Sequence, residues 1–182
     1  MQRAQTQTID RIDVVTGDAG REQAAPLLRS VWPPEVVAEL PWRNVVCARP
    51  DERLLAFNLA GEIIGHTGII LRIAVWNDRP VKIGGIGGVA TRSDSRGRGV
   101  ASAVMRSAVR RMEIVHDVDF GLLFCESRHA RFYELLGWRA FDGDVFVLQP
   151  QGRVRYEVMR PFVSDVKVEI RSGMIDLAGL PW

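Results

Sequence analysis

The sequence predicts one α/β domain in which helices flank a mixed, mostly antiparallel sheet. Three observations predict this class. Runs rich in β-branched residues alternate with short turns before residue 91, a helical pattern begins near residue 100, and an apolar run follows at residues 118–125. The 182 residues suit a single domain with a substantial core, and no linker or repeat divides them. We therefore expect residues 1–182 to fold as one domain.

The first part of the chain predicts one strand and two helices. Residues 9–15 alternate between apolar and polar side chains, which is typical of a half-buried strand. Residues 21–31 favour a helix, and the pair Pro33-Pro34 can start a second helix that runs to about Leu40. Proline costs little in the first turn of a helix, because its missing N–H would be unpaired there.

Three strands should follow, ahead of a glycine-rich turn. Residues 53–60 and 62–76 are β-like, and the second run is rich in isoleucine, which suits a central strand. A turn at residues 77–80 leads into a third strand at residues 81–91. Because short turns join consecutive strands, we expect all three to pair antiparallel.

The second half predicts a long helix, a buried strand, a helix and a final strand. Val100, Val104, Ala108 and Met112 recur at helical spacing and form one apolar stripe. The apolar run at residues 118–125 is typical of a buried strand. A helix over residues 128–136 should then end at Gly137.

The junction between the third strand and the long helix predicts a site for phosphate groups. Six of the 17 glycines lie between Gly84 and Gly99, and glycine lets another molecule approach the main chain closely. The start of a helix offers unpaired N–H groups and the positive end of the helix dipole to an anion. Arg92, Arg96 and Arg98 add positive charge at the same place.

The overall composition excludes several other classes. A net charge of +2 is too balanced for a protein whose main partner is nucleic acid. Cys47 and Cys125 give neither a disulfide framework nor the spacing of metal ligands, so we expect no metal. The polar start, residues 1–7, does not look like a signal peptide, and no run approaches the ~20 apolar residues of a membrane span. We expect a cytoplasmic protein with no membrane partner.

The glycine turn resembles the acyl-CoA site of the GNAT superfamily of N-acetyltransferases. Arg96, Gly99 and Ala101 match the family signature of Arg or Gln, two residues, Gly, one residue, then Gly or Ala. The resemblance implies acetyl-CoA as cosubstrate, with Val89 and Ala90 contacting its pantetheine arm through their backbone. It also implies that the turn holds the pyrophosphate through Arg96, Gly97, Arg98, Gly99, Val100 and Ala101. The order of predicted elements is that of the GNAT fold, whose sheet would splay near residues 85–88.

A second match is Tyr133, which begins the pattern Tyr-x-x-x-Gly-Trp ending at Trp138. The resemblance implies that Tyr133 is the general acid. The chemistry agrees, because a phenol with a pKa of about 10 can protonate a leaving thiolate whose thiol has a pKa of about 8.5.

The general base is less evident, because Gly87 stands where several GNAT enzymes carry a glutamate on the strand before the turn. The candidates that remain are Glu126, His66 and the terminal carboxylate of Trp182. The chain ends on apolar residues, whereas termini are usually polar and frayed. We therefore expect residues 161–182 to form a tail that closes on the acceptor site.

The chain also resembles the aminoglycoside 2′-N-acetyltransferases in its length, its glycine turn and its ending Gly-x-x-Trp. In those enzymes the C-terminal carboxylate lies in the acceptor pocket. The helical region near residues 32–42 would form one wall of that pocket. The expected wall residues are Trp32, Glu35, Glu39 and Trp42. Aminoglycosides are polycations, and besides the terminus only Asp176, Glu35 and Glu39 are evident carboxylates to hold them.

The predicted reaction is acetyl transfer from acetyl-CoA to a primary amine of a small molecule by direct attack, with an aminoglycoside as one candidate acceptor. Two alternatives stay open. One is a GNAT-fold acyltransferase with another acceptor (a polyamine, peptide or protein amine) or a longer acyl donor. The other is a non-catalytic acyl-CoA-binding module that has lost its base. Members of the family often pair, so a homodimer is a further expectation.

Overall fold

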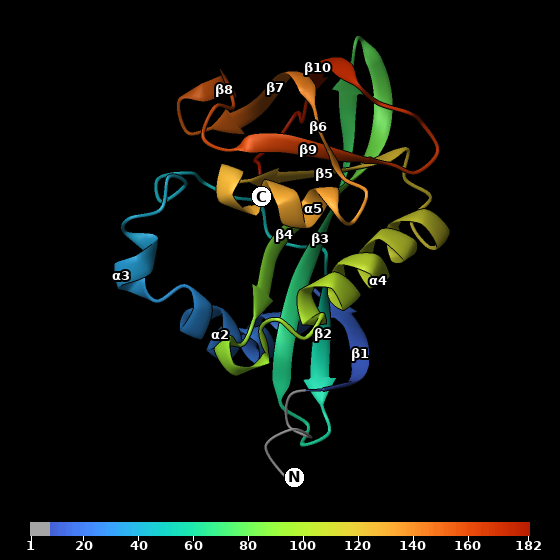
Figure 1. The fold of residues 1–182 in the computed structure, drawn as a ribbon. Helices are drawn as coiled ribbons and strands as arrows, with labels where there is room; N and C mark the ends of the chain where they lie inside the picture. The colour runs from blue at the N-terminus through green and yellow to red at the C-terminus, as the bar shows by residue number, and fades with distance from the viewer. Residues whose placement is uncertain (1–7) are drawn as a thin grey trace.

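The computed structural model describes residues 8–182, and its elements follow one another as Figure 1 shows. Residues 1–7, on which the expectation of no signal peptide rests, lie outside the described residues. The first elements are β1 (Ile9–Thr16), α2 (Ala19–Val31), α3 (Pro34–Val37), β2 (Glu52–Asn58), β3 (Ile63–Trp76) and β4 (Arg79–Thr91). The next are the short 3-10 helix η1 (Ser93–Ser95), α4 (Val100–Ile114), β5 (Phe120–Cys125), the 3-10 helix η2 (Ser127–His129) and α5 (Ala130–Glu134). Five strands complete the chain: β6 (Arg139–Ala140), β7 (Asp142–Gln149), β8 (Gly152–Arg155), β9 (Arg160–Asp165) and β10 (Ser172–Asp176).

The strands form one ten-stranded sheet, in the order β6-β9-β5-β4-β3-β10-β7-β8, with β2 and then β1 also on the β3 edge. Among the strands of residues 8–182, only the pairs β4–β5 and β10–β7 are parallel, so the predicted mixed, mostly antiparallel sheet is confirmed. β3 is long enough to pair β2 with its first half and β10 with its last residues.

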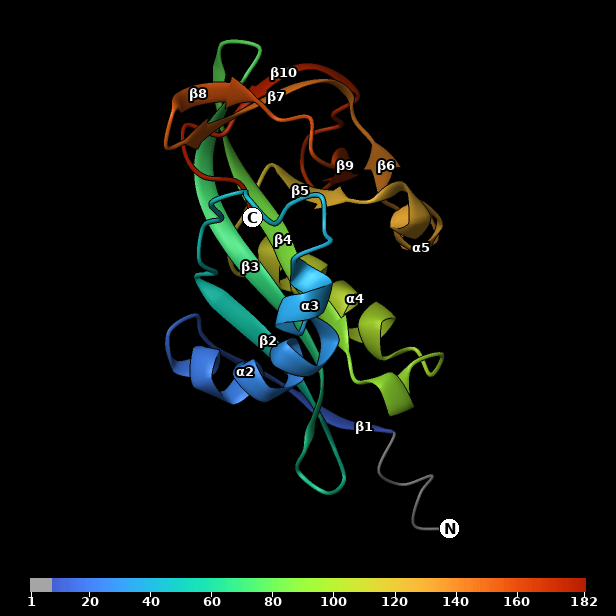
Figure 2. The ribbon, with the colours of Figure 1, turned by 90° about the vertical axis from the view of Figure 1, so that its left-hand side faces the viewer.

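Helices cover the central strands on two faces, as the two views show (Figures 1 and 2). α2 and α3 lie on one side of β3 and β4, and α4 lies on the other. The predicted stripe of α4 explains its position, because Val100, Val104, Ala108 and Met112 are all at most 2% exposed. α5 packs on the α4 side, where Tyr133 and Leu136 contact the same core.

The sheet opens between β4 and β5, where a splay was predicted. The parallel pairing of the two strands ends at Ile86 and Leu123, whereas β4 stays paired to β3 as far as Thr91. The last five residues of β4 therefore have no strand on their β5 side. This opening lies beside the C-terminus of the chain, in the middle of the molecule (Figure 2).

The last third of the chain differs from the expectation. One strand was predicted after Gly137, but five are present. The segment expected to be a tail begins inside the sheet, because β9 pairs β5 and β10 lies between β3 and β7. Only residues 177–182 extend beyond the last strand. None of the helices between residues 8 and 182 is long and apolar enough to cross a membrane.

Candidate active site

A β-bulge interrupts β4 at the edge of the opening. His66 of β3 pairs with Ala90 and Gly68 pairs with Gly87, so the register passes over Gly88 and Val89. Gly88 has a φ of +62°, which a residue with a side chain rarely adopts. A bulge of this kind releases main-chain groups from the ladder and re-aims them. The bulge therefore takes the peptide between Gly88 and Val89 out of the regular ladder with β3.

A side-chain relay holds the bulged peptide. His66 Nδ1 lies 2.6 Å from the carbonyl oxygen of Gly88, and Arg53 Nη1 lies 2.9 Å from His66 Nε2. Arg53 Nε donates in turn to the carbonyl oxygen of Gly17 at 2.9 Å. A carbonyl oxygen can only accept a hydrogen bond and a guanidinium can only donate one. The neutral His66 ring must therefore carry its proton on Nδ1 and accept at Nε2. In a trans peptide, fixing the Gly88 carbonyl also fixes the N–H of Val89 on the opposite side.

His66 does not suit the role of general base. It is 1% exposed, and burial lowers its pKa to about 4, with the nearby Arg53 charge acting in the same direction. Both ring nitrogens already have partners, so the ring is neutral and occupied. Its geometry is that of a residue that positions the main chain of β4.

The glycine turn has the backbone that a phosphate cradle requires. Gly97 and Gly99 have φ values of +72° and +80°, and an added Cβ on either would meet no atom within 4 Å. The α4 helix begins at Val100 without a side-chain cap and without an acidic residue in its first turn. Its first N–H groups and the positive end of its dipole therefore face solvent beside exposed Arg96 and Arg98. These features fit the pyrophosphate of an acyl-CoA.

A cavity of about 510 Å³ lies at the opening of the sheet. It brings together six residues that the sequence singled out for chemistry: His66, Val89, Ala101, Glu126, Tyr133 and Trp182. The other expected donor contacts lie outside this cavity. Arg96, Gly97, Arg98 and Gly99 are exposed in the turn. The side chains of Ala90 and Val100 are 2% exposed core residues, so only their backbone could contact a ligand.

Tyr133 is a half-buried residue of α5 that packs between Phe132 and Phe162, with ring centroids 5.0 and 6.5 Å away. Burial raises its pKa well above the ordinary value for a phenol, and the neighbouring Cys125 acts in the same direction. The hydroxyl therefore keeps its proton at neutral pH and can act as a donor.

The end of the chain is docked over β4. Ala48 N donates to the carbonyl of Pro181 at 2.6 Å, and Leu148 N donates to that of Gly179 at 2.8 Å. The Trp182 indole is 8% exposed and fills the space above Gly85, where any Cβ would lie 2.2 Å from the ring. Over Gly87 a Cβ would lie 3.6 Å from the carboxyl carbon of Trp182. A side chain on residue 87 would therefore lie in contact with the main-chain carbon of Trp182.

Glu126 and Cys125 also line the cavity but are poorer candidates for a direct role. The carboxylate of Glu126 accepts a hydrogen bond from Arg128 at 2.9 Å, so it is already paired. Cys125 is 4% exposed, and burial raises the pKa of its thiol to about 11. A thiol that stays protonated is a poor nucleophile, which disfavours a covalent acyl-enzyme.

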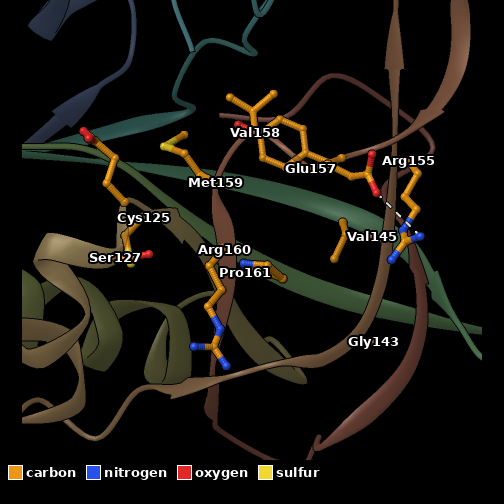
Figure 3. Close-up of a pocket in the computed structure, with 12 residues that line it drawn as sticks. Cys125, Ser127, Gly143, Val145, Arg155, Glu157, Val158, Met159, Arg160 and Pro161 are labelled. Atoms are coloured by element: carbon orange, nitrogen blue, oxygen red, sulfur yellow. Dashed lines mark ion pairs between the residues drawn. The ribbon is translucent and has the colours of Figure 1, made fainter. Parts of the chain in front are cut away.

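A second cavity of about 470 Å³ adjoins the first and shares Cys125, Glu126 and Met159 with it. Figure 3 shows Cys125 and Met159 at one end of this cavity and the ion pair between Arg155 and Glu157 at the other. Arg155 also binds Asp144 at 2.8 Å. The guanidinium of Arg155 in the second cavity is thus already paired with carboxylates.

The expected acceptor wall is half present. Trp32 and Trp42 line the main cavity and form an edge-to-face pair with centroids 6.3 Å apart. Glu35 and Glu39 are exposed and do not line it. Asp176 binds Arg153 at 2.5 Å and also lies outside the lining.

Two features of the site were missed in the sequence. Arg53 stands next to the apolar run Leu54-Leu55-Ala56-Phe57 and is 8% exposed, and a charged residue at the edge of such a run is the signal that could have found it. Met159 lies in the segment between β8 and β9, whose strands were not predicted. The sequence carries no local sign that it reaches the cavity.

Comparison with known proteins decides the family. A family model described as an acetyltransferase (GNAT) domain matches residues 16–141, more than half of the chain. The chain belongs to the GNAT family. The crystal structure of the GNAT N-acetyltransferase YhbS from Escherichia coli in complex with CoA has a similar fold, with a TM-score of 0.62 over 94% of both chains at 14% identity. The crystal structure of Escherichia coli ElaA is also similar, with a TM-score of 0.59 over 87% of this GNAT chain and 100% of its own chain, at 14% identity.

A curated relative of this GNAT protein is the aminoglycoside 2′-N-acetyltransferase of Mycolicibacterium fortuitum. The two are 30% identical over 95 residues, which are 52% of this chain and 48% of the relative. The chain thus matches about half of the length of that relative.

Proposed function

We propose that this GNAT protein transfers an acetyl group from acetyl-CoA to the primary amine of a small molecule by direct attack. One observation carries the proposal: the bulged peptide at Val89, the Tyr133 side chain and the chain end at Trp182 line the same cavity. These three groups supply what the reaction needs, namely a donor for the thioester oxygen, an acid for the leaving sulfur and a base for the amine.

The donor would be held by the main chain of the glycine turn and of β4. The N–H groups from Arg96 to Ala101 and the start of α4 would bind the pyrophosphate, and the edge of β4 near Val89 and Ala90 would contact the pantetheine. The relay from Arg53 through His66 to Gly88 would hold the Val89 N–H toward the thioester oxygen. A hydrogen-bond donor that is already in position before the reaction stabilises the developing oxyanion without reorganisation of the site.

The amine arrives protonated and must lose one proton before it can attack. The terminal carboxylate of Trp182 would take that proton, since its carbon lies beside the place that a side chain on residue 87 would take. The nitrogen then forms a bond to the acetyl carbon, the carbon–sulfur bond breaks, and the sulfur takes a proton from Tyr133. Proton transfer between bulk water and these two groups returns the enzyme to its starting state.

The test is the release of CoA thiol from acetyl-CoA in the presence of aromatic amines, polyamines, aminoglycosides and peptides, with binding of acetyl-CoA measured in parallel by calorimetry. The proposal expects amine-dependent thiol release together with an acetylated amine in the mass spectrum. Binding of acetyl-CoA without turnover of any amine would instead support a non-catalytic acyl-CoA-binding module.

A further inference from the structure

The walls of the main cavity are apolar and aromatic, which restricts the acceptor. Away from the β4 edge, its large side chains are Trp32, Trp42, Phe124, Phe132, Met159 and Trp182. Such walls bind flat apolar groups through area and ring contacts. Apart from their indole N–H groups, these six side chains give no hydrogen bonds to the hydroxyl groups of a sugar, and a buried polar group without a partner loses free energy.

The charges in the cavity disfavour a polycation. Its lining contains the carboxylates of Glu126 and of the chain end, against the guanidinium groups of Arg53 and Arg128. Glu126 is paired with Arg128 at 2.9 Å, so the terminal carboxylate is the negative group left for an ammonium. A second or third ammonium on the same ligand would face Arg53 and Arg128 without a counter-charge.

The adjoining cavity does not supply the missing carboxylates. Glu157 and Asp144 both pair with Arg155, at 3.5 and 2.8 Å. Arg160 adds a further positive group to its lining. The three acidic residues expected to hold a polycation, Glu35, Glu39 and Asp176, lie outside both linings.

Space argues in the same direction. The volume of about 510 Å³ has to hold the thioester end of the donor as well as the acceptor, because Val89 and Tyr133 line the same space as the tryptophans. A small acceptor fits beside the donor, with its amine near Gly87 and its apolar part toward Trp32 and Trp42.

We propose that the acceptor is a small primary monoamine carried on an aromatic group, and that aminoglycosides are poor substrates. This inference rests on the proposed amine acetyl transfer and assigns its substrate class. The single ammonium would meet the terminal carboxylate, and the ring would lie against the edge-to-face pair of Trp32 and Trp42. The structure thus sets the specificity of this chain apart from the activity that its 30% identical relative is named for.

The experiment compares kcat/KM for 2-phenylethylamine and tryptamine with that for ethanolamine, spermidine and kanamycin, at saturating acetyl-CoA. We expect the aromatic monoamines to exceed the other three by about 100-fold or more, since ethanolamine lacks the apolar contact and the two polyamines leave charges unpaired. A higher kcat/KM for kanamycin or spermidine would overturn this inference and leave the proposed function intact. No turnover of any amine, with acetyl-CoA bound, would overturn both.

Two variants of one wall residue sharpen the test. Trp42→Ala should raise KM for 2-phenylethylamine about tenfold, because one face of the ring site is lost, while KM for acetyl-CoA stays unchanged. Trp42→Phe keeps an aromatic wall and should restore most of the affinity. Equal KM values for the aromatic amine in both variants and the unmodified protein would contradict the assigned ring site, and thermal unfolding shows whether each variant is folded.

Discussion

His66 on β3 holds the bulged peptide of β4, with its Nδ1 2.6 Å from the carbonyl oxygen of Gly88. The ring is in turn held by Arg53, a buried residue of β2. Three neighbouring strands thus fix one peptide at the edge of the opening. If that peptide presents the Val89 N–H to the thioester, the relay controls catalysis through geometry and not through proton transfer.

The first prediction concerns His66→Ala. Removing the donor to Gly88 lets the bulge relax and should lower kcat about 10- to 100-fold, somewhat less than the loss of a whole oxyanion donor. The KM for acetyl-CoA should change less than kcat, since the pyrophosphate cradle is untouched. His66→Gln, which keeps an N–H donor, should recover part of the rate. A uniform rise in KM with unchanged kcat would contradict the positioning role.

The same side chain predicts a pH dependence of stability. The pKa of His66 is lowered from 6.5 to about 4 in the folded protein, so the unfolded chain binds more protons between these two values. The contribution of His66 to the free energy of unfolding should therefore be complete above pH 6.5. It should fall by roughly 3 kcal/mol as the pH drops toward 4. Urea unfolding of the unmodified protein and His66→Gln over this range checks it, because the variant should show a shallower decline. Parallel curves would show that other groups cause the acid sensitivity.

Tyr133→Phe should lower kcat about 100-fold, because the leaving thiolate loses its acid. The raised pKa of the phenol predicts that the unmodified enzyme shows no alkaline loss of kcat from Tyr133 up to a pH of about 10. The chain offers a matched control in Tyr156, its other tyrosine, which is buried in the second cavity against Phe124. Tyr156→Phe should keep the full rate. Equal rates in both variants would remove Tyr133 from the mechanism.

Gly99→Ala tests the phosphate cradle. At a φ of +80° an added methyl group meets no atom, so the cost is conformational, about 1–2 kcal/mol in the free energy of unfolding. The altered backbone should also weaken CoA binding, measured by calorimetry. Gly152→Ala changes a glycine that also has a positive φ and open surroundings, at the start of β8. It should lose stability and keep CoA affinity, and a loss of affinity in both variants would point to a general effect of destabilisation.

The sequence predicts the part of the fold in which each element carries its own signal. β3 and α4 are long and strongly patterned, so local propensity and the final packing agree, and the glycine turn lies between them as expected. The strands after Trp138 carry no such signal. β6 has two residues, β8 has four, and β10 pairs with β3, a strand about a hundred residues earlier in the chain. Short strands of this kind are defined by long-range pairing, which a local pattern does not encode.

The candidate site divides in the same way. Tyr133 and Trp182, which both line the main cavity, were singled out because each belongs to a sequence pattern that resembles one with a known chemical role. The relay through Arg53 and His66 was not predicted from the sequence, because it depends on a bulge that exists only in the register between β3 and β4. The absence of the glutamates from the acceptor wall also needed the structure, since α3 ends at Val37 and leaves Glu35 and Glu39 on the surface.

The chain end gives the most direct test, since its carboxyl carbon lies 3.6 Å from where a Cβ on Gly87 would be. One glycine appended after Trp182 would keep the indole and displace the carboxylate. Gly87→Glu in a chain lacking Trp182 would return a carboxylate to the same place, because residue 87 has no positive φ. The measurement is kcat for acetyl transfer to one amine in these chains and in the chain lacking Trp182 alone. The account predicts that the appended glycine and the deletion each lower kcat about 100-fold and that Gly87→Glu restores a large part of it. Full activity in the chain with the appended glycine would contradict the account.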